Sequence, residues 1–372
     1  MEAMGDNIYA KEISKTGFVL EYKVADLLRQ AGWTVISNKY YEDDFEGSVR
    51  EIDLLAYKVR KVQQVDVYTT LLISCKKSES DVWALLARDI NLKDPNADWC
   101  PLHAWSNDKA IAFEISKPKT SLTYHEHAIN FGVKEALSMP DYEVFAFQEM
   151  NRTSGAAKND KNIFAAVTSL MKAQAYELGA LSQRKNKPSV YQFNLLSVID
   201  SEIVRLVIDK DEISQEIVDS EHYISRYIIN KRETFSRIRF VSYASFKDKI
   251  KDYKRLHDAN CKWFDDAIDS FYDEILKDYT RSNILLDDFQ GEIWWDVYWP
   301  IRRKHNIKIE KENIFVGWIK ESEFAKIEIT CDESVIDDLN ANTTIKEKVG
   351  AALKKVYRYE GEFVFEINDI PF

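Results

Sequence analysis

Near the N-terminus, the spacing of hydrophobic residues predicts a helix followed by three strands. In TGFVLEYKVADLLRQAGW (residues 16–33), apolar side chains recur every three or four positions, the period of a helix with one buried face. Thr16 is a suitable N-cap for this helix, and Gly32 is a suitable terminator. Strands are predicted at WTVIS (residues 33–37), Ser48–Lys58 and Val65–Cys75, with an acidic loop at residues 40–48. A helix followed by a strand and a hairpin indicates an α/β fold.

The rest of the chain contains both the helical and the strand pattern of hydrophobic residues. Helices are predicted at residues 81–90, 127–138, 163–181, 247–264, 264–279 and 344–359. Strands are predicted at residues 109–116, 142–150, 189–199, 201–209, 237–246, 313–319, 324–330 and 362–367, of which 189–199 and 201–209 are expected to pair across a short turn. We therefore expect an α/β domain at residues 1–258 and a smaller α+β domain at residues 259–372.

Composition and charge narrow the class of protein. The 372 residues, 45% of them hydrophobic, are enough for two domains with real cores. The four cysteines are widely separated and contain no C-x-x-C pair, which disfavours a disulfide framework or a zinc site. No apolar run is long enough for a membrane span or a signal peptide, so a cytoplasmic protein is expected. The net charge of −11 disfavours a general nucleic-acid coat protein, although a local basic groove remains compatible with it.

Charged residues inside these first elements are candidates for chemistry. Glu21 lies beside the apolar stripe of the first helix, where an unpaired carboxylate is costly. Alternation along the strands places Glu51, Asp53 and Leu55 on one face of the first hairpin strand, with Ser74 and Lys76 sharing a face of the second. If these strands pair, Asp53 and Lys76 meet near the rim of the sheet. A divalent metal shared by Glu21 and Asp53 would offset their charge.

These segments resemble a known family. GFVLEYKVADLLRQAGWTVI, REIDLLAYK and LLISCKKS are similar to the core motifs of the restriction-endonuclease-like, or PD-(D/E)XK, nuclease superfamily. The resemblance covers about residues 17–78 and is to bacterial members with an E…EID…E-C-K pattern. It implies a mixed-sheet core flanked by helices. It also implies that Glu21, Asp53 and the Cys75 backbone carbonyl bind Mg²⁺ or Mn²⁺ and that Lys76 assists the attacking water.

The chain departs from this pattern at Ser74, where the family has Glu or Asp. A hydroxyl can hold a metal-bound water, so Ser74 stays in the predicted catalytic set with Lys76, but it brings no negative charge. Three outcomes follow: Glu21 and Asp53 suffice for one metal, another acid compensates, or the site is inactive. Glu51 is the best replacement acid, and Glu79 is a weaker one.

The resemblance implies a metal-dependent endonuclease acting on DNA more readily than RNA, with a role in bacterial antiviral defence. The alternative is a catalytically silent nuclease fold that binds nucleic acid or assembles with a partner protein. A homodimer or a defence-system protein is the expected protein partner.

A second candidate feature is WWDVYWPIRRKH (residues 294–305), which combines aromatic and basic side chains. Such a segment can stack bases and bind phosphates, or it can be the core of a small domain followed by a charged turn. The sequence favours a small-domain core followed by a charged turn, and nucleic-acid binding stays open as the alternative.

Overall fold

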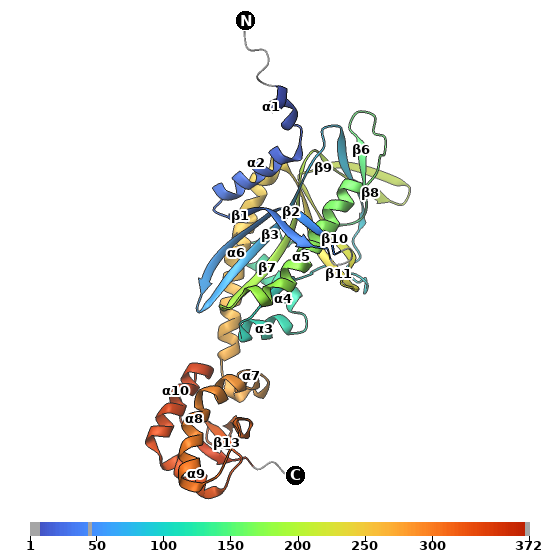
Figure 1. Ribbon diagram of the computed structural model, residues 1–372. Helices are drawn as coiled ribbons and strands as arrows, with labels where there is room; N and C mark the ends of the chain where they lie inside the picture. The colour runs from blue at the N-terminus through green and yellow to red at the C-terminus, as the bar shows by residue number, and fades with distance from the viewer. Residues whose placement is uncertain (1–7, 44–46, 369–372) are drawn as a thin grey trace. The chain divides into compact units, whose positions relative to one another are not determined.

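A seven-stranded mixed sheet organises the N-terminal part of the chain in the computed structural model (Figure 1). Its strands follow the order β1 (Thr34–Glu42), β2 (Val49–Val62), β3 (Val65–Lys77), β7 (Ser189–Asp200), β11 (Arg232–Ser242), β10 (Ser220–Ile229), with β5 (Ala104–Ser106) paired to β7. The pairs β1–β2, β2–β3 and β10–β11 are antiparallel, whereas β3–β7 and β7–β11 are parallel. A parallel pair needs a crossover connection, and α5 (Lys161–Arg184) lies in the one that precedes β7.

Helices cover both faces of this sheet. Side chains of α5, including Leu170, share a buried cluster with Leu72 and Phe193 on one face. Thr69 points to the opposite face from Leu72, and it contacts Asn260 of α6 (Tyr243–Tyr272). Helix α2 (Gly17–Gln30) lies on the α6 side, where the carbonyls of Ala31 and Gly32, just after the helix, accept hydrogen bonds from Lys58. The result is a helix–sheet–helix layering.

The structure describes residues 8–43 and 47–368, and these form two compact units, Met1–Asp265 and Asp266–Phe372. The division falls inside α6, as does the boundary at residue 258 predicted from the sequence. Residues 44–46 of the predicted acidic loop lie outside the described residues, as do residues 1–7. Every helix in the described ranges is too short or too polar to cross a lipid bilayer.

The first unit also contains a smaller four-stranded sheet and short helices. The small sheet has the order β6 (Tyr142–Asn151), β4 (Asp81–Asp89), β8 (Ile203–Asp209), β9 (Glu212–Val218). The short helices are α1 (Ile8–Ile13), α3 (Lys109–Ser116) and α4 (Thr120–Asn130).

The second unit is a small α+β fold. A three-stranded sheet, β12 (Ile314–Ile319), β13 (Phe324–Ile329) and β14 (Phe363–Ile367), packs with α7 (Tyr279–Ile284), α8 (Leu286–His305), α9 (Glu333–Ala341) and α10 (Thr343–Tyr357). Two 3₁₀ turns, Ile275–Lys277 and Lys311–Asn313, complete it. Its core includes the fully buried side chains of Phe289, Val297, Val349 and Ile327.

The predicted mixed α/β character is confirmed, as are the helix at residues 16–33 and the hairpin that follows it. Two element predictions are wrong. Residues 81–90 form strand β4 instead of a helix, because this apolar run is covered by neighbouring strands β6 and β8 and can be buried on both faces. Residues 109–116 form helix α3 instead of a strand, and Asp108 caps it by accepting a hydrogen bond from the Ile111 amide at 3.1 Å.

Two further predictions need correction. The strands predicted at residues 189–199 and 201–209 both form, but β7 joins the large sheet and β8 joins the small one, so they do not pair with each other. The helix predicted at residues 127–138 begins earlier, at Thr120, and ends at Asn130. Gly132 adopts a positive φ of +96° two residues later, a conformation that glycine tolerates and that terminates the helix.

Candidate functional site

Strands β2 and β3 stop pairing at Asp53. Their antiparallel ladder runs from Val62↔Val65 to Leu54↔Ile73, and beyond it the Asp53 carboxylate takes up hydrogen bonds. Asp53 Oδ2 accepts from the Cys75 backbone amide at 2.6 Å and from Ser74 Oγ at 3.3 Å. The amide and carbonyl of a strand residue point to the same side, so the Cys75 carbonyl also faces the side on which Asp53 lies. The backbone therefore brings a carboxylate and a carbonyl together at the end of the ladder.

A local break in strand alternation accompanies Asp53. In the β1–β2 ladder, Ser37 pairs with Leu54 and Lys39 pairs with Ile52, so Asn38 would be expected to pair with Asp53. Asn38 and Asp53 do not pair, and Asn38 has a φ of +56°. The predicted sharing of one strand face by Asp53 and Leu55 therefore does not hold. Ile52 and Leu55 both join the cluster packed with α5, although residues three apart on a regular strand point to opposite faces.

Glu21 reaches the same region from α2. It is half-buried on the helix, one residue after the buried Leu20. Burial raises the pKa of Glu21 above its ordinary value, and the negative charges of Asp53 and Glu51 raise it further, while Lys76 lowers it. The four charged groups thus lie near enough to act on one another. Three of them are acids, so the site carries excess negative charge.

Glu51 is held in this region by a residue that the sequence analysis missed. Asn38 Nδ2 donates a hydrogen bond to Glu51 Oε1. The left-handed conformation of Asn38 interrupts β1 where this contact forms. Asparagine is among the few residues that tolerate a positive φ. Its position inside an otherwise strand-like run was therefore the feature of the sequence that could have predicted the interruption of β1.

The two lysines that end β3 have different surroundings. Lys77 donates to the Ser14 carbonyl at 2.7 Å and lies 3.3 Å from a Glu79 carboxylate oxygen. Lys76 makes no hydrogen bond or ion pair with any other residue that the structure describes. Lys76 is therefore the lysine free to meet a bound molecule, and Glu79 is already engaged by Lys77.

Ser74 and Cys75 are both buried. Ser74 is 1% exposed, and its hydroxyl faces Asp53 without adding charge. Burial raises the pKa of the Cys75 thiol well above its ordinary value, and the neighbouring charges of Asp53 and Glu21 act in the same direction. The thiol stays protonated, so Cys75 offers its backbone carbonyl and not its sulfur.

The protein ligands for a metal are few. Within residues 8–43 and 47–368, no group of three or more His, Cys, Asp or Glu side chains is arranged to hold a metal ion. Mg²⁺, however, often binds through one or two carboxylates, with waters and substrate phosphate filling its remaining positions. Glu21, Asp53 and the Cys75 carbonyl fit this way of binding Mg²⁺. A cation would relieve the repulsion from Asp53 and Glu51 that contributes to the raised pKa of Glu21.

The aromatic segment at residues 294–305 divides between core and surface. Ile293, Val297 and Ile301 form the buried face of α8. Trp295 and Trp299 are 55% and 47% exposed, with their rings nearly parallel at a centroid distance of 6.0 Å. The core interpretation therefore does not account for these two tryptophans.

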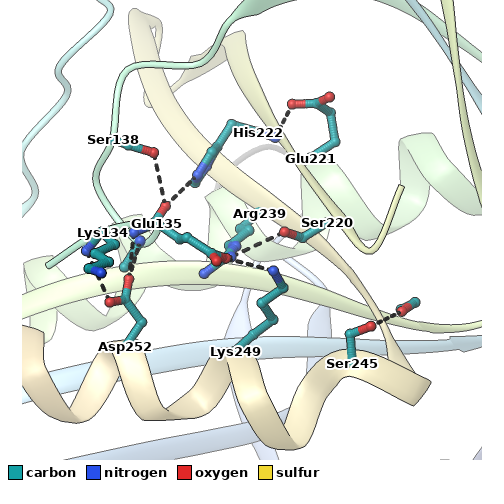
Figure 2. Close-up of polar contacts among 12 residues, drawn as sticks. Lys134, Glu135, Ser138, Ser220, Glu221, His222, Arg239, Ser245, Lys249 and Asp252 are labelled. Carbon is teal, nitrogen blue, oxygen red and sulfur yellow. Dashed lines mark hydrogen bonds and ion pairs between the residues drawn. The ribbon is translucent and has the colours of Figure 1, made fainter. Parts of the chain in front are cut away.

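A second charged cluster lies in the first unit, around the loop that follows α4 (Figure 2). Asp252 accepts hydrogen bonds from three successive backbone amides, those of Lys134, Glu135 and Ala136, at 2.5–3.1 Å. Lys249 Nζ lies 2.7 Å from Glu135 Oε2, which also pairs with Arg239. Its acids are fully engaged by the protein itself, which indicates a structural role.

His222 belongs to the same cluster and is neutral. Its Nε2 contacts the Glu135 carbonyl at 2.7 Å, and since a carbonyl only accepts, this nitrogen carries the proton. Burial lowers the pKa of His222 well below its ordinary value, and the nearby charges of Arg237 and Arg239 lower it further. This histidine therefore stays uncharged at neutral pH.

Comparison with known proteins leaves the chain without a neighbour: no family model, no curated protein and no solved structure matches it.

Proposed function

We propose that the protein hydrolyses phosphodiester bonds of DNA in a reaction that depends on Mg²⁺ or Mn²⁺. The observation that carries this proposal is that the charges of Asp53 and of Lys76, which pairs with no described residue, both act on the pKa of Glu21 near the point where β2 and β3 stop pairing. Two carboxylates and a cation brought together from three elements are a common basis for metal-assisted hydrolysis.

The architecture supports a restriction-endonuclease-like core. Strands β1, β2 and β3 form an antiparallel meander, and β7 then adds parallel to β3 after the crossover through α5. Helices on both faces enclose this mixed sheet (Figure 1). Asp53 and Lys76 lie on adjacent strands of this sheet, near the point where β2 and β3 stop pairing, which supports a shared site.

In this proposal each residue of the site has a defined task. Glu21, Asp53 and the Cys75 carbonyl would hold the metal, which when bound supplies positive charge for the phosphate and lowers the pKa of a coordinated water. Lys76 orients the attacking water and stabilises negative charge on the phosphate oxygens. Ser74 keeps the Asp53 carboxylate oriented through its hydroxyl. Glu51, held by Asn38, adds the negative charge that Ser74 lacks.

A second candidate function follows from two observations. Ser74 replaces the family acid, and the described residues contain no three-ligand metal group. Both favour a silent nuclease fold that binds nucleic acid or assembles with a partner. In either form, we propose a cytoplasmic protein of bacterial defence, acting as a homodimer or with a defence-system protein.

Cleavage assays separate the two functions. Supercoiled DNA, single-stranded DNA and RNA are each incubated with the protein and Mg²⁺ or Mn²⁺. We expect DNA cleavage that falls by at least about 100-fold in Asp53→Asn and in Lys76→Gln, since each change removes charge stabilisation from the transition state. The matched control is Lys77→Gln, which removes the neighbouring lysine and should retain cleavage.

Ser74→Glu tests the departure from the family directly. Cleavage by the natural protein supports the proposal, and Ser74→Glu should then tighten metal binding without being required for activity. Cleavage that appears only in Ser74→Glu, or in no variant, would show that the natural site is silent and would favour the second function.

A further inference from the structure

A cavity of about 280 Å³ lies on the α5 face of the large sheet. Its lining residues come from β1, β2, β3, the start of β7, the C-terminal end of α5 and Lys185, which follows this helix. Ligand pockets usually begin at roughly 300 Å³, so this one suits a single ring system with a small substituent better than a larger molecule.

Aromatic rings form one wall of the cavity. Tyr68 and Tyr191 stack almost parallel, with centroids 4.2 Å apart and an interplanar angle of 5°. Tyr57 adjoins Tyr68 at 5.7 Å, and Phe193 adjoins Tyr191 at 6.2 Å. Burial raises the pKa of Tyr191, as does the neighbouring Tyr68, so the Tyr191 side chain stays uncharged at physiological pH. Such a surface favours a flat aromatic ligand.

The charged residues around this wall are mostly basic. Among the described residues that line the cavity, Glu177 is the single acid, and it lies 3.7 Å from Lys39 and 3.1 Å from Arg184. Lys185 lies over Tyr68 and Tyr191 at 5.1 and 5.2 Å from their ring centroids, and it pairs with no carboxylate in the described part of the chain. Three cations against one carboxylate leave the cavity positive within a protein of net charge −11, which favours an anionic ligand.

A buried hydroxyl in the same cavity lacks a partner. Thr70 lines the cavity and is 2% exposed, and its Oγ1 makes no hydrogen bond to any described residue. An unsatisfied buried hydroxyl is destabilising, and buried polar groups are usually paired. A ligand with a hydrogen-bonding edge would satisfy it.

The cavity and the candidate nuclease site share strands β1 and β2. Leu55 lines the cavity and follows Asp53 by two residues, a distance of about 7 Å along a strand. On β1, Lys39 lines the cavity and Asn38, the residue before it, contacts Glu51. Glu51 precedes Ile52, which packs on the α5 side, so Glu51 points to the opposite face from the cavity. Because β1 is an edge strand of the sheet, a polynucleotide strand that passes over this edge could reach both faces.

We propose that this cavity binds one nucleotide of the polynucleotide substrate, with its base against the tyrosine wall and its phosphate near Lys185 and Arg184. The inference rests on the proposed nuclease function. The same chemistry would suit a free mononucleotide, but the edge strand β1, which carries Lys39 of the cavity and Asn38 of the candidate site, favours a nucleotide within the substrate strand.

Binding measurements in the Asp53→Asn background test this without requiring cleavage. Fluorescence anisotropy of labelled single-stranded oligonucleotides is compared for Tyr57→Leu and Lys185→Gln. Each should weaken binding on the order of tenfold, the effect of losing one base stack or one phosphate contact. The controls are Tyr57→Phe, which keeps the ring, and Lys187→Gln, which removes an exposed lysine two residues from Lys185. Lys185→Gln alters a partly exposed side chain, so it remains informative if Tyr57→Leu unfolds.

Competition with nucleoside monophosphates distinguishes the two ligand sources. Weaker oligonucleotide binding in both test variants, with both controls unchanged, supports the proposal even if no cleavage is found and the nuclease function fails. Unchanged oligonucleotide affinity overturns it, and loss of mononucleotide binding alone would then assign the cavity to a free nucleotide.

Discussion

Two groups of carboxylates in the first unit have opposite electrostatic surroundings. Glu135 is partly buried, which by itself raises its pKa, but the hydrogen bond from Lys249 and the charge of Arg239 outweigh burial and lower it. Glu21 is also partly buried, yet its nearest acids raise its pKa further. The cluster around Glu135 supplies its own cations (Figure 2), whereas the site around Glu21 does not supply enough. A carboxylate group left short of positive charge is a place where a cation from solution can bind.

The largest effect is expected from Asp252→Ala. The change leaves three backbone amides without their acceptor, so the free energy of unfolding should fall by about 3 kcal/mol. Urea denaturation measures the loss. Asp248→Ala, four residues earlier on α6, is the control and should leave the midpoint unchanged, because Asp248 is exposed and its ion pair is with the similarly exposed Lys251. Equal behaviour of the two variants would contradict a structural role for the cluster.

Glu135→Gln should have a smaller effect of the same sign, about 1 kcal/mol, because the carboxylate is half exposed but Arg239 is 2% exposed and loses its counter-ion. The pKa of Glu135 is lowered in the folded state. The Glu135 carboxylate therefore contributes its full stabilisation above the unfolded-state pKa of 4.5, and this stabilisation is lost as pH falls through the folded-state pKa. Denaturation curves measured from pH 3 to pH 7 should show that the stabilities of the wild type and Glu135→Gln become equal at acid pH. A difference that stays constant with pH would rule out the charge as its cause.

Glu21→Gln should act in the opposite direction and stabilise the protein by roughly 0.5 kcal/mol at pH 7, after allowance for solvent screening. The pKa of Glu21 is raised in the folded state. The free energy of unfolding of the wild type should therefore equal that of the variant below pH 4.5 and become smaller than it as pH rises through the folded pKa. Measured across the same pH range, the stability difference should therefore have the reverse sign from that of Glu135→Gln. Destabilisation by Glu21→Gln at pH 7 would contradict the repulsion described at this site.

The smallest effect expected is a metal-dependent rise in melting temperature. At a Mn²⁺ concentration equal to its dissociation constant, binding stabilises the native state by only about 0.4 kcal/mol. The wild type should show the rise, and Asp53→Asn should not. An equal rise in both proteins would place metal binding elsewhere in the chain.

The local elements of the site were predictable because each has a strong periodic pattern. The apolar stripe of α2 and the two strands of the hairpin show their buried faces in the sequence, and Glu21 stands out as a charge beside such a face. Residues 81–90 and 109–116 were predicted wrongly for one shared reason. Both are short apolar runs, and such runs fit a helix or a strand equally well until neighbouring elements cover them.

The amino-acid sequence by itself determined the mixed α/β class, the helix that carries Glu21 and the hairpin that carries Asp53 and Lys76, because hydrophobic period and turn residues act locally. Only the tertiary structure decided that β7 and β8 join different sheets, that Asn38 breaks β1 and contacts Glu51, and that tyrosines from three strands meet beneath α5. These features depend on which strands pair and in what register. Strand pairing is a choice among partners far apart in the chain, and it is settled by the burial that the whole sheet achieves.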